Sequence, residues 1–211
     1  MKKINRAVLI PLLTALALIG GYFVMRAVVP VDVDSLPISE LLVFYSFDKD
    51  NINMMVGNSD YVFVGRVLEK TGTQYRDYGY IEGRRVGGMP YTYYNVQVLE
   101  NIKGRLRTAE PIEVQKRGGL AESKKVVSLE EGDRLPREGG IYVFVAYAQE
   151  DGSLVLNGRQ SNIPVELSEG QNILDTPQYR EYAEAYENEV LPSINGGTPR
   201  NRERFESIYA E

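Results

Sequence analysis

The chain has 211 residues and a formal net charge of -5, and it contains neither cysteine nor histidine. Without cysteine no disulfide framework exists. Without histidine, the usual general base, the commonest zinc ligand and every Ser-His or Cys-His catalytic pair are excluded. An enzyme with this sequence would have to use carboxylates, lysine, tyrosine or serine.

The first 26 residues predict a membrane anchor. Lys2, Lys3 and Arg6 precede an uncharged apolar run over residues 7–25. At about 1.5 Å per residue, a helix of this length spans close to the roughly 30 Å hydrocarbon core, and basic residues ahead of it favour a cytoplasmic N-terminus. We therefore expect a single-pass protein of the cell membrane that contacts the lipid bilayer through residues 7–25. Its C-terminal domain is expected to be extracytoplasmic.

A cleaved signal peptide is the alternative interpretation of the same segment. Ala15 and Ala17 form the A-x-A pair that precedes a cleavage site, but a cut there leaves the apolar residues 18–25 exposed. Further along, Met25 and Arg26 lie where such a site requires small residues. We expect the segment to be retained as a signal anchor, with cleavage left open.

The exported part is long enough for one domain with an ordinary core. Leaving out the four basic residues of the first 26, which contain no acids, takes the net charge from -5 to -9. A field of this sign repels polyanions, so nucleic acid is not expected as a partner. We divide this part into a spacer at 27–37, a domain at 38–192 and a C-terminal tail at 193–211.

Apolar and alternating runs predict five short strands in the domain. Residues 61–68 and 141–148 are apolar at almost every position, which is typical of strands buried on both faces. Residues 92–99 alternate apolar and polar side chains, and Asp-Gly at 151–152 indicates a hairpin turn. The predicted strands are 61–68, 92–99, 111–115, 141–148 and 154–156. Because no helices alternate with them, we expect an antiparallel barrel or sandwich.

Helices are predicted at the margins of the strand region. Residues 50–56 form a short helix ending at Gly57, and a longer one runs from Pro177 to about Val190 with Thr176 as its cap. A last short helix is expected at 203–209. The apolar stripe of the longer helix is interpreted as core packing and consists of Tyr179, Tyr182, Ala183, Tyr186 and Val190.

Four segments carry a characteristic order of strands and glycines: 60–67 (DYVFVGRV), 94–104 (YNVQVLENIKG), 112–114 (IEV) and 139–147 (GGIYVFVAY). Together they resemble netrin-like, or tissue-inhibitor-of-metalloproteinase-like, domains of exported proteins, over roughly residues 58–148. The resemblance implies a mainly β fold: a five-stranded OB-like barrel, here with a C-terminal α-helix, in a bacterial-type, membrane-anchored protein.

The inhibitory chemistry of that family does not carry over to this chain. Family members that inhibit metalloproteases use a free N-terminal cysteine to chelate the zinc of the enzyme, together with several disulfides, and this chain has no cysteine. The resemblance therefore implies a fold and no inhibitory residue.

The connection between the first two strands is the candidate binding surface. In OB folds this connection commonly binds ligands, and here residues 71–91 combine tyrosine and arginine, which dominate interface hot spots, with glycines. The alternative is an extended hairpin whose tyrosines pack its own two arms. The candidate partner-binding residues are Tyr75, Tyr78, Tyr80, Arg84, Arg85 and Tyr91.

No cofactor or metal site is predicted. Asp48, Asp50 and Asn53 do not match a calcium loop, because Ile52 occupies the third ligand position. We expect a non-catalytic, membrane-anchored module that binds a protein or peptide. Two alternatives stay open: a structural scaffold of the cell envelope, and a carboxylate-dependent hydrolase of envelope glycans that uses acids such as Glu122, Glu130, Glu131 and Asp133.

Overall fold

The computed structural model describes residues 33–43, 45, 47–76, 79–191 and 203–211. The chain separates into two compact units, Met1–Ser35 and Leu36–Glu211. The described part of the first unit is the 3-10 helix η1 (Val33–Ser35). The predicted anchor at residues 7–25 lies outside the described residues. Of the helices that are described, none is long and apolar enough to cross a membrane.

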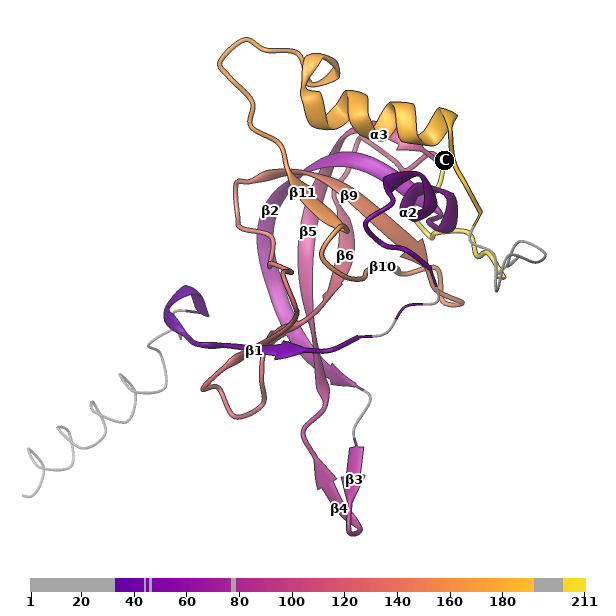
Figure 1. Cartoon of the computed structure of the whole chain (residues 1–211). Coiled ribbons are helices and arrows are strands. Elements are labelled where there is room, and N and C mark those ends of the chain that lie inside the picture. The colour runs from indigo at the N-terminus through magenta and orange to yellow at the C-terminus, as the bar shows by residue number, and fades with distance from the viewer. Residues whose placement is uncertain (1–32, 44, 46, 77–78, 192–202) are drawn as a thin grey trace, which may run out of the picture. The chain divides into compact units, whose positions relative to one another are not determined.

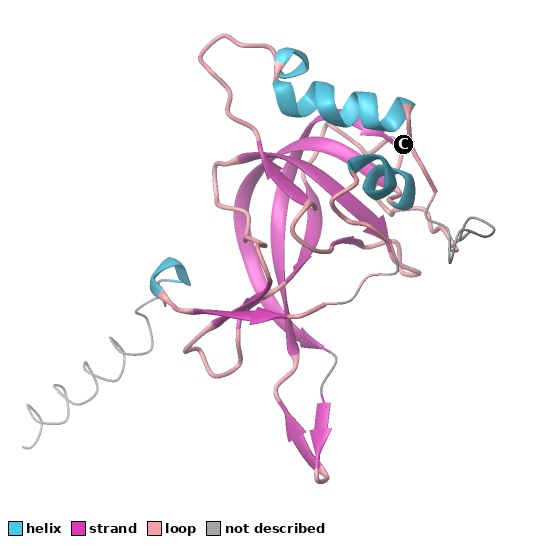
Figure 2. Ribbon diagram, viewed as in Figure 1, coloured by secondary structure: helices cyan, strands magenta, loops and turns pink. Residues whose placement is uncertain are grey.

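The second unit is mainly β, which confirms the predicted class, and its longest helix follows the strands (Figure 2). The helices are α2 (Ile52–Asn58), the 3-10 helix η2 (Ile173–Asp175) and α3 (Pro177–Glu187). The strands are β1 (Ile38–Leu41), β2 (Tyr61–Arg76), β3 (Gly79–Ile81), β4 (Arg84–Val86), β5 (Met89–Lys103), β6 (Ile112–Arg117), β7 (Gly119–Leu120), β8 (Val127–Glu130), β9 (Ile141–Ala148), β10 (Leu154–Leu156) and β11 (Asn162–Pro164).

Five of these strands pair in a closed ring. The largest sheet has the order β10-β6-β5-β2-β9-β11, and a further pairing joins β10 to β9. The ring therefore runs β2-β5-β6-β10-β9 and returns to β2. These are the five strands that the sequence predicts, and each covers all or nearly all of its predicted range.

Three features of the sheets differ from the sequence prediction. β2 and β5 extend far beyond 61–68 and 92–99, because their pairing continues out to Arg76 and Met89. The pairing is also not antiparallel throughout, since β10 runs parallel to β6 and β1 runs parallel to β8. β1, β8 and β7 form a separate three-stranded sheet that no sequence pattern indicated.

Alternation along the ring strands divides the core into two clusters. Phe63 and Phe144 belong to one cluster, to which every ring strand contributes. Their neighbours Val62 and Val64 point the other way, into a second cluster that contains Tyr182 of α3. Because successive side chains of a strand face opposite sides, a strand buried on both faces must be apolar at consecutive positions. This explains the continuous apolar runs at 61–68 and 141–148.

Gly65 lies where the long β2–β5 pair bends. The register between these strands shifts at several points, including between Val64 and Gly65, and such bulges bend and twist a strand. A Cβ atom at Gly65 would lie 2.5 Å from Cγ1 of Val96. Only glycine therefore allows the strands to approach this closely inside the ring.

The two α-helices lie against the second cluster and contact each other (Figure 1). α2 begins after Asn51, whose side chain accepts a hydrogen bond from Met54 N–H (3.1 Å). α3 begins after Thr176, whose hydroxyl accepts from Tyr179 N–H (3.3 Å), as the sequence predicts. Both helices therefore start at capping residues that are visible in the sequence.

The apolar stripe of α3 is only partly buried. Tyr182 is 1% exposed, but Tyr186 and Val190 are 41% and 43% exposed, and α3 ends at Glu187. The interpretation of the whole stripe as core is therefore wrong for its C-terminal members. Ala185, which the sequence analysis did not include, is buried in their place.

Residues 203–211 do not form the predicted helix. They are extended with a turn near their end, and Ala210 pairs with Leu106 in a β-bridge. Phe205 and Tyr209 pack against the core cluster inside the ring. The apolar spacing that suggested a helix reflects this packing, because the backbone hydrogen bonds of the segment go to distant parts of the chain.

Candidate functional site

The predicted connection at 71–91 is an extended hairpin, the alternative left open by the sequence. β2 and β5 stay paired as far as Arg76 and Met89. Beyond them β3 and β4 pair from Gly79 with Val86 to Ile81 with Arg84. Figure 1 shows this tip projecting beyond the ring of strands, at the lower end of the view.

The tip closes with a two-residue turn in an unusual conformation. Glu82 and Gly83 have φ angles of 50° and 74°. Positive φ at both central positions defines the type I′ turn that matches the twist of a hairpin. Glycine adopts this conformation freely, but a glutamate there costs roughly 1–2 kcal/mol. The tip therefore carries backbone strain at Glu82.

The tyrosines of the hairpin stem are held by contacts with β7 and with the stem itself. The hydroxyl of Tyr75 donates to the carbonyl of Leu120 (3.1 Å). The guanidinium of Arg76 lies over the ring of Tyr91, 4.8 Å from its centroid, and donates a hydrogen bond to the hydroxyl of Tyr93. Tyr75 and Tyr91 are thus held in place as the hairpin alternative predicts. Tyr93, which the sequence analysis did not select, belongs to the same group.

The tip presents the exposed candidates. Tyr80 is 71% exposed, and Arg84, on the opposite strand, is also exposed. The backbone of Arg85 pairs in register with Tyr80. Tyr78 and the side chain of Arg85 lie outside what the structure describes. The predicted site thus separates into a fixed stem, with Tyr75 and Tyr91, and an exposed tip.

A pair of glycines joins the base of the hairpin to the end of β6. Gly118 N–H donates to the carbonyl of Pro90 (2.8 Å), and the hydroxyl of Thr92 donates to the carbonyl of Gly118 (2.7 Å). A Cβ atom at Gly119 would lie 2.1 Å from the Thr92 hydroxyl oxygen. The two glycines therefore serve the close packing of the hairpin base.

A buried ion pair lies beside this base. Lys116 of β6 has a fully buried side chain, and its Nζ lies 2.7 Å from a carboxylate oxygen of Asp133, which is 1% exposed. The same amine donates to the carbonyl of Gly158 (2.8 Å) and to the hydroxyl of Ser161 (2.9 Å). Burial lowers the pKa of Lys116 to about 8, and the Asp133 carboxylate opposes this shift.

The sequence analysis weighed residues 116–119 as an anion site or a strand end and did not identify the ion pair of Lys116, although one signal of its burial was present. In β6, Ile112 and Val114 are buried in the core cluster, and Lys116 is the next residue on that face. Strand alternation therefore places this lysine inside. Its partner Asp133 lies in a loop, and no local pattern connects the two residues.

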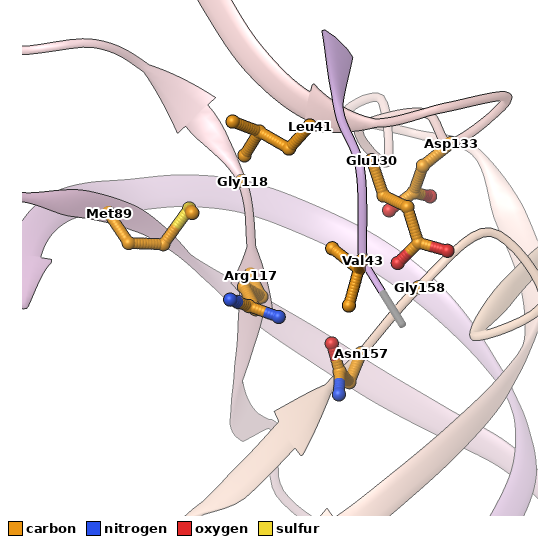
Figure 3. Close-up of a pocket in the computed structure, with 9 residues that line it drawn as sticks. All are labelled: Leu41, Val43, Met89, Arg117, Gly118, Glu130, Asp133, Asn157 and Gly158. Carbon is orange, nitrogen blue, oxygen red and sulfur yellow. The ribbon is translucent and has the colours of Figure 1, made fainter. Parts of the chain in front are cut away.

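A second polar group, around Glu130, adjoins this pair (Figure 3). The hydroxyl of Tyr45 donates to Glu130 (2.5 Å), and Lys49 forms an ion pair with the same carboxylate. Burial raises the pKa of Tyr45 to about 12 and lowers that of Lys49 to about 8. The residues form a connected set of paired charges.

The cavity at this cluster is very small. Its volume is about 10 Å³, close to the space that one water molecule needs. Glu130 and Asp133 each pair with a lysine, and Ser161 and Lys116 are both fully buried. A sugar ring cannot reach these groups in this arrangement. The cavity is lined by Leu41, Val43, Met89, Arg117, Gly118, Glu130, Asp133, Asn157 and Gly158.

Within the described residues, no three or more Asp, Glu, His or Cys side chains gather in a way that could hold a metal ion. Asp50, considered in the sequence as a calcium ligand, forms an ion pair with Arg159 instead.

No protein-family model matches the chain, and no curated protein matches it.

Proposed function

We propose that the unit at 36–211 is an OB-type barrel of the netrin-like kind, carried by an anchor at residues 7–25. An OB fold is a five-stranded Greek-key barrel. The ring β2-β5-β6-β10-β9, in which β6 and β10 are parallel and the other neighbours antiparallel, supports this assignment. The order of the four strand-and-glycine segments in the sequence supports it as well.

We further propose that the protein is a non-catalytic binding module of the extracytoplasmic membrane surface, which recognises a protein or peptide through the tip of the hairpin. The observation that carries this proposal is Tyr80, 71% exposed on a tip that projects from the fold. Tyrosine and arginine supply large contact areas and hydrogen bonds at interfaces. Arg84, which is also exposed, supplies a positive charge on the same tip.

The backbone strain at Glu82 also supports the proposal that the tip binds a partner. Residues in sparsely populated backbone conformations cluster at ligand-binding and switch regions. Glu82 adopts such a conformation, with φ of 50°. The hairpin stem, fixed by Tyr75 and by Arg76 against Tyr91, provides a firm base for the tip.

A scaffold role is the second candidate, and the exposed side chains of β1 favour it. Ile38 is 58% exposed, and Leu42, which follows β1, is 82% exposed. Because Ile38 and Leu42 are four residues apart in extended chain, they lie on one side. Another envelope protein could cover them without using the hairpin.

A pull-down with the full-length, membrane-bound protein distinguishes these candidates. Replacing the tip residues by the double change Tyr80→Ala/Arg84→Ala is expected to abolish capture of a crosslinked partner and to leave the thermal unfolding midpoint unchanged. The matched control, Tyr186→Ala/Arg180→Ala, removes an exposed tyrosine and arginine from α3 and is expected to retain capture. If the tip variant still captured the partner, the assignment of the binding site to the tip would be wrong. Loss of capture by Ile38→Ser/Leu42→Ser instead would favour the scaffold.

A further inference from the structure

Residues 203–211 pack along the connection between β5 and β6 and pair with it through one isolated β-bridge. Ala210 and Leu106 form a β-bridge, and Arg107 N–H donates to the carbonyl of Tyr209 (2.9 Å). These contacts join backbone to backbone, in the manner of β-strand addition. The connection between β5 and β6 thus supplies one wall of a docking groove.

The turn between β9 and β10 holds the middle of the segment. Ile208 N–H and the hydroxyl of Ser207 both donate to the carbonyl of Gly152, each at 3.1 Å. Ser207 N–H in turn donates to the hydroxyl of Tyr61 (3.0 Å). Ser207 is buried, so a small polar side chain fits this position specifically.

Arg204 fastens the beginning of the segment. Its guanidinium donates to the carbonyls of Gly57 and Ser59, at 2.7 Å each, and pairs with Asp60 (3.3 Å). These acceptors lie at the end of α2 and the start of β2. Hydrogen bonds to charged groups are the strong ones, so Arg204 is the main polar anchor of the segment.

The segment lies on the surface of the ring and leaves space beside it. An open hollow of about 460 Å³ lies beside the segment and is distinct from the docking groove that the segment occupies. Only Phe205, Tyr209 and Ala210 reach the core cluster, as partly buried side chains. The segment thus resembles a bound ligand more than a built-in strand. The hollow is lined by residues at the ends of β2 and β5 and by residues of the segment: Asp60, Tyr61, Gly104, Arg105, Arg204, Phe205, Glu206, Ala210 and Glu211.

The segment is joined to the rest of the chain by a long, glycine-containing stretch. Residues 192–202 include Gly196 and Gly197, and a chain of this length reaches up to roughly 40 Å when extended. The hydrogen bonds described above join the segment to residues at least 55 positions away in sequence. The same hydrogen bonds can therefore form when the segment comes from another molecule.

We propose that this groove is a peptide-docking site, which the chain fills with its own residues 203–211 and which accepts the same segment from a second copy. Two copies would then exchange segments, as in domain swapping. At low protein concentration the chain's own segment occupies the groove, because a tether of this kind gives that segment an effective concentration in the millimolar range. The proposal is independent of the role of the hairpin tip.

Two complementary full-length variants test the exchange. In Gly152→Asn the groove is blocked, because a Cβ atom there would lie 2.6 Å from the Ile208 side chain, while asparagine tolerates the φ of +76°. In Arg204→Ala/Ser207→Ala the groove is intact, but the segment is expected to bind at least about tenfold more weakly. Native mass spectrometry of the mixture is expected to show a one-to-one dimer, and each variant alone a monomer. Only monomers in a mixture of two folded variants would overturn the proposal.

A second experiment covers the case in which Gly152→Asn does not fold. A protease site replaces residues 195–199 of the full chain, which is cleaved after folding and mixed with a fluorescent 203–211 peptide. Saturable uptake is expected after cleavage and not before it, and an Arg204→Ala peptide is expected to need about tenfold higher concentration. A folded, cleaved protein that takes up no peptide, or takes up a scrambled peptide equally well, would overturn the proposal.

Discussion

Lys116 shows how one residue can hold several loops together. Its amine joins β6 to Asp133 and to the carbonyl of Gly158 and the hydroxyl of Ser161, in a site without solvent exposure. A buried charge is tolerated only when it is paired and fully hydrogen-bonded. The four groups therefore act as one unit that fixes the loops beside the hairpin base.

Removing the amine of Lys116 is expected to be strongly destabilising. Lys116→Ala leaves the Asp133 carboxylate buried without its partner, which costs about 3–5 kcal/mol. Arg180→Ala is the matched control, because it breaks an ion pair with Asp175 whose members are 65% and 61% exposed. Exposed pairs contribute about 0–1 kcal/mol. Urea unfolding measures the loss in free energy of unfolding for each variant. Equal losses would contradict the buried position of the Lys116–Asp133 ion pair.

The pH dependence of stability provides a separate test of Lys116. Burial lowers the pKa of its amine to about 8, against 10.5 in an unfolded chain. Between these values the unfolded state binds more protons than the folded state, so this group makes the free energy of unfolding rise with pH. The slope is at most about 1.4 kcal/mol per pH unit.

Lys116→Met removes this titration. The stability difference between the natural protein and the variant is therefore expected to grow from pH 8 to pH 10.5, measured by urea unfolding at several pH values. A difference that stays constant over this window would show that the pKa of Lys116 is not lowered.

At the scale of elements, the hairpin carries the proposed binding tip, and a substitution can relieve the strain of its turn. Asparagine adopts positive φ more readily than glutamate. Glu82→Asn is therefore expected to stabilise the tip by about 1 kcal/mol. This corresponds to roughly fivefold slower amide hydrogen exchange in β3 and β4. Glu166→Asn, at an exposed position outside the turn, is the control and is expected to leave this exchange unchanged. If amide exchange in β3 and β4 did not change in Glu82→Asn, the backbone at Glu82 would not be strained as inferred.

The ring strands could be predicted because their patterns are local. Consecutive apolar residues at 61–68 and 141–148 follow from burial on both faces, and the caps Asn51 and Thr176 lie beside the helices that they start. The hairpin extent was harder to predict, because residues 71–91 are rich in glycine and tyrosine and show no regular alternation. Their strand structure depends on pairing with each other.

Non-local pairing explains the remaining differences. The parallel contact of β10 with β6 closes the ring and depends on the whole topology. The pairing of Lys116 with Asp133 depends on loop geometry. The helical spacing of Phe205, Ile208 and Tyr209 was misleading, because the segment binds to distant strands as an extended chain.

At the scale of the whole molecule, the proposed protein has three parts: an anchor at residues 7–25, a ring of strands, and a hairpin that carries the proposed recognition residues away from the ring. An anchor confines the encounter with a partner to the membrane surface. The long stem then sets how far from the ring the tip reaches. The net charge of -9 calculated for residues 27–211 gives this module a field that favours neutral or basic partners over polyanions.

The proposed contact between the hairpin tip and a partner is tested by site-specific photocrosslinking. A photoreactive phenylalanine analogue replaces Tyr80 in the full-length protein in its own membrane. A second variant of the same protein carries the analogue in place of Tyr186 on α3. We expect illumination to give one dominant crosslinked species from position 80 and none of that mass from position 186. Crosslinking from position 186 with none from position 80 would contradict the account.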